Sequence, residues 1–181
     1  RRLTEFLPET FSDNRIGEQA QLAIAAFRAG VCVSASLSTG GFDTHGNHDA
    51  NHFPSLQTLT DGLNILWQEA EAAGVADRVF VAVGSDFGRT PGYNGGNGKD
   101  HWPITSMMFQ GAGVPGNTVI GSSTHRHQAD SYNLDTLARD DGGSHIEPGH
   151  IHRAIRQLAG IDDSELAAAF PIENQRIPLF G

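Results

Sequence analysis

The segment RVFVAVGSD, from Arg78 to Asp86, constrains the fold more than any other stretch of the chain. Its apolar residues follow one another almost without alternation, as in a strand that is covered on both faces. Strands of this kind belong to parallel sheets flanked by helices. The preceding segment, residues 53–74, carries leucines at helical spacing and ends in glycine, so a helix is expected before the strand.

The remaining elements follow from the same reasoning. Helical periodicity predicts a helix over residues 16–30 and a last helix over residues 148–160, which has a proline at its first turn. Short apolar runs predict strands at 31–37 and 104–113, and a brief one at 117–121, whereas 122–149 should be polar loop and the tail extended. This order predicts an α/β fold, a mostly parallel sheet flanked by helices, in a single domain over residues 1–181.

Composition excludes several classes of partner. The chain has 181 residues and a formal net charge of -9, which disfavours nucleic acid and anionic lipid surfaces. No apolar run reaches the length of a membrane span. The single cysteine, Cys32, excludes an intrachain disulfide framework and is expected to be a small buried apolar residue.

Acidic and histidine side chains gather where two predicted strands end. In open α/β sheets, ligands bind beyond the carboxyl ends of the strands. The first strand leads to Asp43 and His45, and the second ends at Asp86, so parallel strands would bring all three to one edge. Residues i and i+2 of an extended segment point the same way, so Asp43 and His45 can aim at one point. Carboxylate and imidazole ligands suit Zn, Mn or Fe better than Ca or Mg, although Asp-x-His also occurs often by chance.

Other histidines are assigned by their position. His48 is either a further metal ligand or a hydrogen-bond partner of one, whereas His52 is expected to flank the helix that begins near Phe53. A loop rich in glycine and asparagine carries His101 and can fold back over the strand ends. His150 and His152 diverge by about 200° on their helix, so they cannot share a metal and are expected to be structural.

Four motifs, GFDTH, SDFGRTP, GKDHWP and GAGVPGNTVIGSS, occur in the order found in the domain-of-unknown-function-1501 family. The resemblance covers residues 31–160, and the family looks like a branch of the alkaline-phosphatase and sulfatase superfamily. It implies a central, mostly parallel sheet with two divalent metals at its strand ends. By motif, Asp43 and His45 resemble first-metal ligands, His101 resembles the later histidine ligand, and Asp86 resembles the acid of the second metal.

The sequence departs from this pattern at two places. Phe87 stands where metal-binding relatives usually have a histidine, so the second site is either lost or completed by another ligand. Nothing before Val31 resembles the first strand of the superfamily, which brings a metal aspartate and the nucleophile. The chain is therefore expected to be the C-terminal part of a longer alkaline-phosphatase-like domain and to need the missing N-terminal segment of the same protein.

Three functions follow as expectations. The first is a metal-dependent hydrolase of sulfate or phosphate esters, small-molecule or glycan, in which Arg89 either binds the anion or orders its loop through an ion pair. The divalent ion would be Zn, Mn, Fe or Ca, held by a set chosen from Asp43, His45, His48, Asp86 and His101. The second is a non-catalytic secreted or envelope protein with one structural metal, which Phe87 favours. The third is a binding module for an anionic glycan through Arg89, Tyr93 and Trp102. The family resemblance implies a periplasmic or extracellular location.

Overall fold

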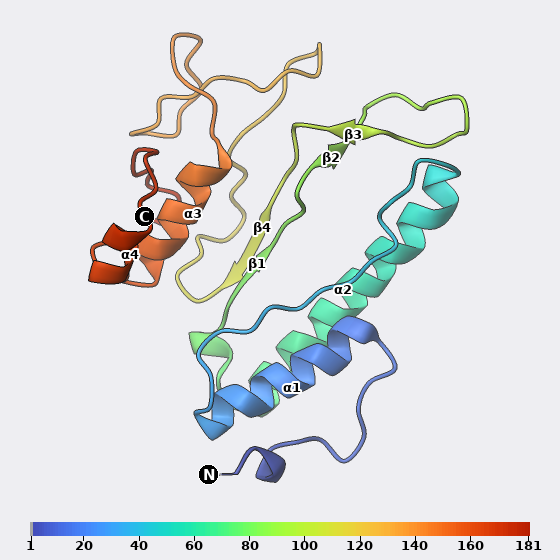
Figure 1. Cartoon of the computed structure of the whole chain (residues 1–181), viewed down its shortest axis with the longest axis vertical. Coiled ribbons are helices and arrows are strands. Elements are labelled where there is room, and N and C mark those ends of the chain that lie inside the picture. The colour runs from blue at the N-terminus through green and yellow to red at the C-terminus, as the bar shows by residue number, and fades with distance from the viewer. Residues whose placement is uncertain (1) are drawn as a thin grey trace. The chain divides into compact units, whose positions relative to one another are not determined.

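The computed structural model describes residues 2–181, in two compact units of which the first reaches Ala112 and the second is Gly113–Gly181 (Figure 1). The first unit holds the 3-10 helices η1 (Leu3–Glu5) and η2 (Ala76–Arg78), helices α1 (Arg15–Ala29) and α2 (His48–Ala72), and strands β1 (Phe80–Val83), β2 (Gly88–Arg89), β3 (His101–Trp102) and β4 (Met108–Gly111). The second holds α3 (Pro148–Leu158) and α4 (Glu165–Ala169). The expectation that residues 1–181 are the C-terminal part of one longer domain stays a prediction.

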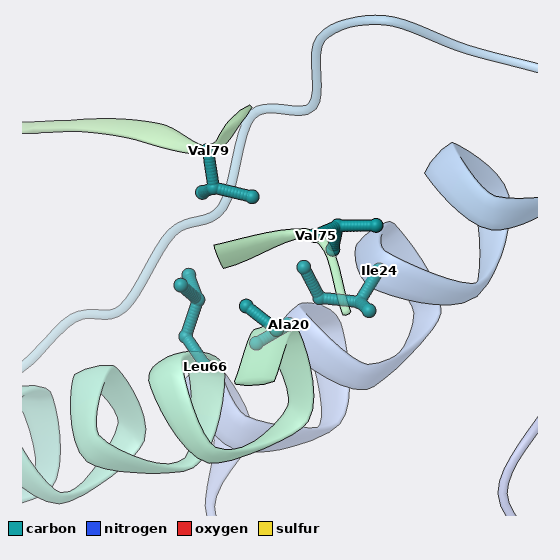
Figure 2. Packing of buried hydrophobic residues seen from close by; sticks show 6 residues of the cluster. Ala20, Ile24, Leu66, Val75 and Val79 are labelled. Carbon is teal, nitrogen blue, oxygen red and sulfur yellow. The ribbon is translucent and has the colours of Figure 1, made fainter. Parts of the chain in front are cut away.

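Helices α1 and α2 form the core of the first unit. The Asn14 side chain caps α1 by accepting hydrogen bonds from the backbone of Ile16 and Gly17, and Gly30 ends the helix in the left-handed conformation, with φ 73°. Apolar side chains of both helices then meet the segment that leads into β1 (Figure 2). The buried cluster consists of Ala20, Ile24, Leu66, Ala70, Val75 and Val79.

Glycine sets the distance between these two helices. A Cβ atom on Gly62 of α2 would overlap the side chain of Ile16, and one on Gly17 of α1 would lie 2.7 Å from Ile65 Cδ1. The two glycines therefore let the helix backbones approach closely. The Ile16 side chain packs where a side chain at position 62 would otherwise lie.

The strands pair antiparallel, which corrects the prediction of a mostly parallel sheet. β1 pairs with β4, with Phe80 opposite Gly111 and Val83 opposite Met108, and β2 pairs with β3 in a second two-stranded sheet. Parallel pairing needs a crossover connection, usually a helix, whereas residues 84–107 return from β1 to β4 through the β2–β3 hairpin. Within residues 2–181 only the general α/β class therefore holds, with helices and small antiparallel sheets.

Two predicted strands are wrong. Residues 31–37 and 117–121 form no strand in the described structure, where Val33 is 99% and Val119 93% exposed. A run of β-branched residues favours a strand because such residues fit a pleated, half-buried surface. In the described chain neither run has a neighbouring strand to pair with, so neither forms one.

The helix predictions are confirmed, with two differences in detail. α2 begins at His48 rather than near Phe53, so His52 lies inside the helix, and the short helix α4 lies between α3 and the tail of residues 171–181. Glu147 and His150 form a capping box at α3, in which Glu147 N donates to His150 Nδ1 at 2.9 Å. The structural role expected for His150 is thus borne out. Across the described residues, none of the helices is both long and apolar enough to cross a membrane.

Candidate metal centre

Two chain segments build the site, and backbone hydrogen bonds hold them together. The first is residues 42–48, which run into α2, and the second is the loop of residues 90–100 that joins β2 to β3. Lys99 N donates to Thr44 O at 3.0 Å, and His48 N donates to Asn97 O at 2.8 Å. The glycine-rich loop therefore lies against residues 44–48, whereas the sequence predicted that it folds back over the ends of parallel strands, which the described residues do not form.

The Asn94 side chain organises this loop. Its Oδ1 accepts hydrogen bonds from Gly96 N and Gly98 N, each at 3.0 Å. Its Nδ2 donates to His45 O at 3.0 Å and to Asp100 Oδ1 at 3.1 Å. One amide thus ties the loop to itself, to the first segment and to an acid beside the candidate ligands.

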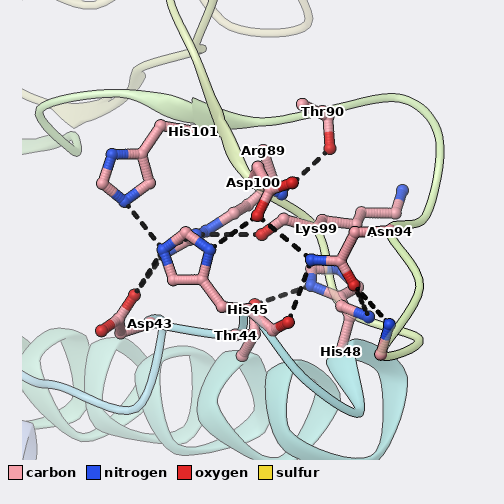
Figure 3. A network of polar contacts seen from close by, with 12 residues as sticks. Asp43, Thr44, His45, His48, Arg89, Thr90, Asn94, Lys99, Asp100 and His101 are labelled. Atoms are coloured by element: carbon pink, nitrogen blue, oxygen red, sulfur yellow. Dashed lines mark hydrogen bonds and ion pairs between the residues drawn. The ribbon is translucent and has the colours of Figure 1, made fainter.

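Asp43, His45 and His101 each offer one ligand atom, and these three atoms lie within 4.8 Å of one another (Figure 3). His45 Nε2 is 3.3 Å from Asp43 Oδ1 and 3.1 Å from His101 Nε2. Two ligands about 2.1 Å from a tetrahedral zinc are about 3.4 Å apart, so these separations fit one ion with little movement. Two imidazoles and a carboxylate also match the donor types that Zn, Mn or Fe take.

Asp100 lies on the other side of the His45 ring. Its Oδ1 is 2.8 Å from His45 Nδ1, and this hydrogen bond, followed by that from Asn94, lowers the pKa of the Asp100 carboxyl. Sequence reasoning gave Asp100 no role beyond its place before His101. The signal that was missed is the pairing of this acid with a histidine more than fifty residues earlier, which adjacent sequence cannot reveal.

Arg89 holds the two segments together. Its side chain is only 13% exposed, and Nη2 donates to Phe42 O at 2.8 Å and to Asp43 Oδ1 at 3.2 Å. Nη1 donates to Lys99 O at 3.0 Å and lies 3.4 Å from His45 Nε2. Of the two roles that the sequence left open for Arg89, these contacts favour ordering the loop.

Asp86 and Phe87 directly precede strand β2 in the chain. The Phe87 ring stacks on His101, with centroids 3.8 Å apart and planes inclined by 26°. Asp86 is exposed and lies outside the triad of ligand atoms found among the described residues. Phe87 therefore fixes one face of the His101 imidazole, and a metal role for Asp86 stays a prediction.

His48 points into the protein beneath the loop. It is 8% exposed, its Nδ1 is 2.7 Å from Thr44 Oγ1, and its ring stacks on that of His52 at 4.4 Å. His52 Nδ1 is buried without a hydrogen-bond partner among the described residues. The His48 ring thus has a hydroxyl partner and lies outside the triad. A metal role for His48 stays a prediction.

These two histidines predict acid sensitivity of folding. Burial lowers the pKa of His48 and of His52, and the neighbouring cations Lys99 and Arg89 lower both further. As the pH falls, these histidines therefore bind protons in the unfolded chain, near pH 6.5, before they do so in the folded chain. The contribution of the two neutral histidines to stability is complete above that pH and is lost as the pH falls below it. Between about pH 7.5 and pH 5 the melting temperature should fall, and His52→Gln should make the fall shallower.

The control for this experiment is His125→Gln, because His125 is exposed in the second unit. It should leave the slope of melting temperature against pH unchanged. An equal slope in the native chain and in His52→Gln would contradict the assignment. The lowered pKa of Asp100 does not interfere, since it acts below about pH 4.

Comparison with known families places the chain. A family model described as "Protein of unknown function (DUF1501)" matches residues 7–177. The chain belongs to the DUF1501 family. No curated protein matches this DUF1501 chain, and no solved structure matches it. The family expected from the motifs is confirmed, whereas its place in the alkaline-phosphatase and sulfatase superfamily stays a proposal.

Three of the four motifs that indicated the DUF1501 family converge at the candidate site. GFDTH supplies Asp43 and His45, and GKDHWP supplies Asp100 and His101. SDFGRTP supplies Phe87, which stacks on His101, and Arg89, which bonds to Asp43. The three motifs are thus parts of one cluster of side chains.

Proposed function

We propose that this DUF1501 chain carries the divalent-metal site of a hydrolase that acts on sulfate or phosphate esters. The observation that carries the proposal is the triad of Asp43, His45 and His101, whose ligand atoms lie within 4.8 Å of one another. Three protein ligands leave at least one position of a tetrahedral ion open, as in catalytic rather than structural zinc sites. A divalent ion bound there would polarise the ester oxygen and lower the pKa of a nucleophile.

The residues around the triad suit an anionic ester. All three candidate ligands are exposed, so a small molecule or the end of a glycan chain can reach them. Arg89 neutralises part of the charge of Asp43, and in this proposal it is a positioning residue because its donors already hold Phe42 O and Lys99 O. The nucleophile would come from an N-terminal segment, as the superfamily resemblance implies.

One observation favours a second candidate, a non-catalytic protein with one structural metal. Phe87 covers His101, and Asp86 lies outside the triad, so the described residues supply ligands for one ion. The superfamily resemblance implies two ions for catalysis. A periplasmic or extracellular location belongs to both candidates and rests on that resemblance alone. Glycan binding by Arg89, Tyr93 and Trp102 without metal stays a prediction.

Hydrolysis of aryl sulfates and aryl phosphates by the full-length protein separates the two candidates. After removal of metal by a chelator, activity should be absent, and Zn or Mn should restore it. His45→Ala should lower the rate at least 100-fold, because it removes a ligand, while Asp77→Ala, which changes an exposed acid away from the triad, should keep it. Metal binding without hydrolysis of any ester would support the structural candidate, and activity that survives His45→Ala would refute this site.

A further inference from the structure

The carboxylate of Asp100 makes a contact that the proposed metal site does not itself use. It lies outside the triad, yet its Oδ1 is 2.8 Å from His45 Nδ1, the ring nitrogen that does not face the other candidate ligands. We propose that Asp100 is a positioning residue of this site, which holds His45 with its proton on Nδ1 and its Nε2 lone pair toward Asp43 and His101. This inference rests on the proposed metal site.

The reason lies in the chemistry of imidazole as a ligand. A neutral histidine binds a metal through the nitrogen that carries no proton, and the hydrogen bond made by the other nitrogen decides which one that is. Carboxylates flank both nitrogens of His45, with Asp100 at 2.8 Å from Nδ1 and Asp43 at 3.3 Å from Nε2. The closer acceptor is at Nδ1, so the single proton of the neutral ring belongs there.

Arg89 favours the same tautomer from the other side. Its Nη1 lies 3.4 Å from His45 Nε2, and a guanidinium nitrogen can only donate. A proton on Nε2 would therefore face this donor, whereas a lone pair accepts from it. Asp100 and Arg89 thus act in the same direction on the two nitrogens of one ring.

Asp100 is itself held in place at both ends. Asn94 Nδ2 donates to its Oδ1 at 3.1 Å, Asp100 N donates to Thr90 Oγ1 at 3.0 Å, and Thr90 N donates to Asp100 O at 2.9 Å. Figure 3 shows Asp100 between Thr90, Asn94 and His45, with Asp43 and His101 beyond the opposite edge of the His45 ring. A carboxylate fixed in this way determines the plane of the His45 ring as well as its tautomer.

The direct test is the tautomer of His45 in the metal-free chain, read from ¹⁵N–¹H correlation spectra of the imidazole at about pH 8.5, where ordinary histidines are neutral. The native chain should show the proton on Nδ1. Asp100→Ala removes the acceptor and should shift the population toward the Nε2 proton, which faces Asp43. Asp100→Asn keeps a carbonyl acceptor and should retain the native tautomer. A native chain with the proton on Nε2, or one that Asp100→Ala leaves unchanged, would overturn the inference.

Zinc affinity, measured by competition with a chromophoric chelator, gives the second readout. Asp100→Ala should weaken binding 10- to 100-fold, the usual effect of removing the partner of a metal-binding histidine, and Asp100→Asn should weaken it less. Asp77→Ala, an exposed acid that pairs only with Arg78 among the described residues, is the control and should bind as the native chain does. Weaker binding in Asp100→Ala with an unchanged tautomer would show a merely structural role and contradict the proposal.

The two readouts separate this inference from the proposed function. If the native chain binds no zinc but Asp100→Ala still switches the tautomer, the metal site fails and the orientation of His45 by Asp100 stands. If zinc binds and the tautomer does not depend on Asp100, the site stands and the positioning role fails. Circular dichroism of each variant shows whether it has folded, and Asp100→Asn, which keeps the size of the side chain, tests the tautomer even if Asp100→Ala unfolds.

Discussion

Replacing Asp43 and His101 together by alanine should abolish divalent-metal binding, because it removes two of the three ligand atoms that lie within 4.8 Å of one another. The native chain, dialysed to equilibrium against buffer with a fixed free concentration of Zn or Mn, should hold close to one ion per chain above that in the buffer, by mass spectrometry of the metal. The double variant should retain none. Both side chains are exposed, so the melting temperature of the metal-free protein should change little.

Three further single variants make this measurement decisive. Asp77→Ala is the control and should retain the ion. Asp86→Ala and His48→Gln test the two ligands that the sequence suggested and that lie outside the triad. If either variant loses the ion while folded, the site is larger than the triad. A native chain that binds no Zn, Mn or Fe would contradict the proposed metal centre.

Gly98→Ala should disrupt the site through the backbone alone. Gly98 is buried where the loop crosses the first segment, and a Cβ atom there would overlap the carbonyl group of His45. A backbone group cannot move aside as a flexible side chain can, so the loop must shift away from residues 44–48. Overpacking of this kind costs about 1–3 kcal/mol of the free energy of unfolding. We expect a lower melting temperature and at least 10-fold weaker zinc binding, although no ligand is changed.

The matched control is Gly95→Ala in the same loop, where an added Cβ atom would meet nothing within 4 Å. It should leave both the melting temperature and zinc binding as they are in the native chain. Thermal unfolding and chelator competition measure the two effects. A folded Gly98→Ala chain with native zinc affinity would show that the contact between loop and segment does not position the ligands.

Helices were predictable from this sequence because their signals are local. The apolar stripe of residues 53–74 and the Gly30 stop are visible within a few turns, and α1 and α2 follow them closely. Strand direction was not predictable, because it depends on the connection between strands rather than on the strands themselves. The run RVFVAVGSD does form β1, but its partner β4 returns through a hairpin and so lies antiparallel.

In the candidate site too, contacts between neighbouring residues were predictable and contacts between distant segments were not. Asp43 and His45 could be paired from their i and i+2 spacing, and the structure brings them together. His101 was assigned from the resemblance, and the antiparallel pairing of Arg89 with His101 brings it next to the first segment. The contact of Asp100 with His45 could not be predicted, because it depends on the register in which the loop lies against residues 44–48.

The exposure of the triad has a consequence for the lifetime of a bound ion. The side chains of Asp43 and His45 are 82% and 46% exposed, so water and competing chelators reach the ligand atoms directly. Such an ion would exchange quickly with the medium, and its occupancy would follow the free metal concentration around the protein. A chelator that binds the ion more tightly than the site does would therefore remove it quickly.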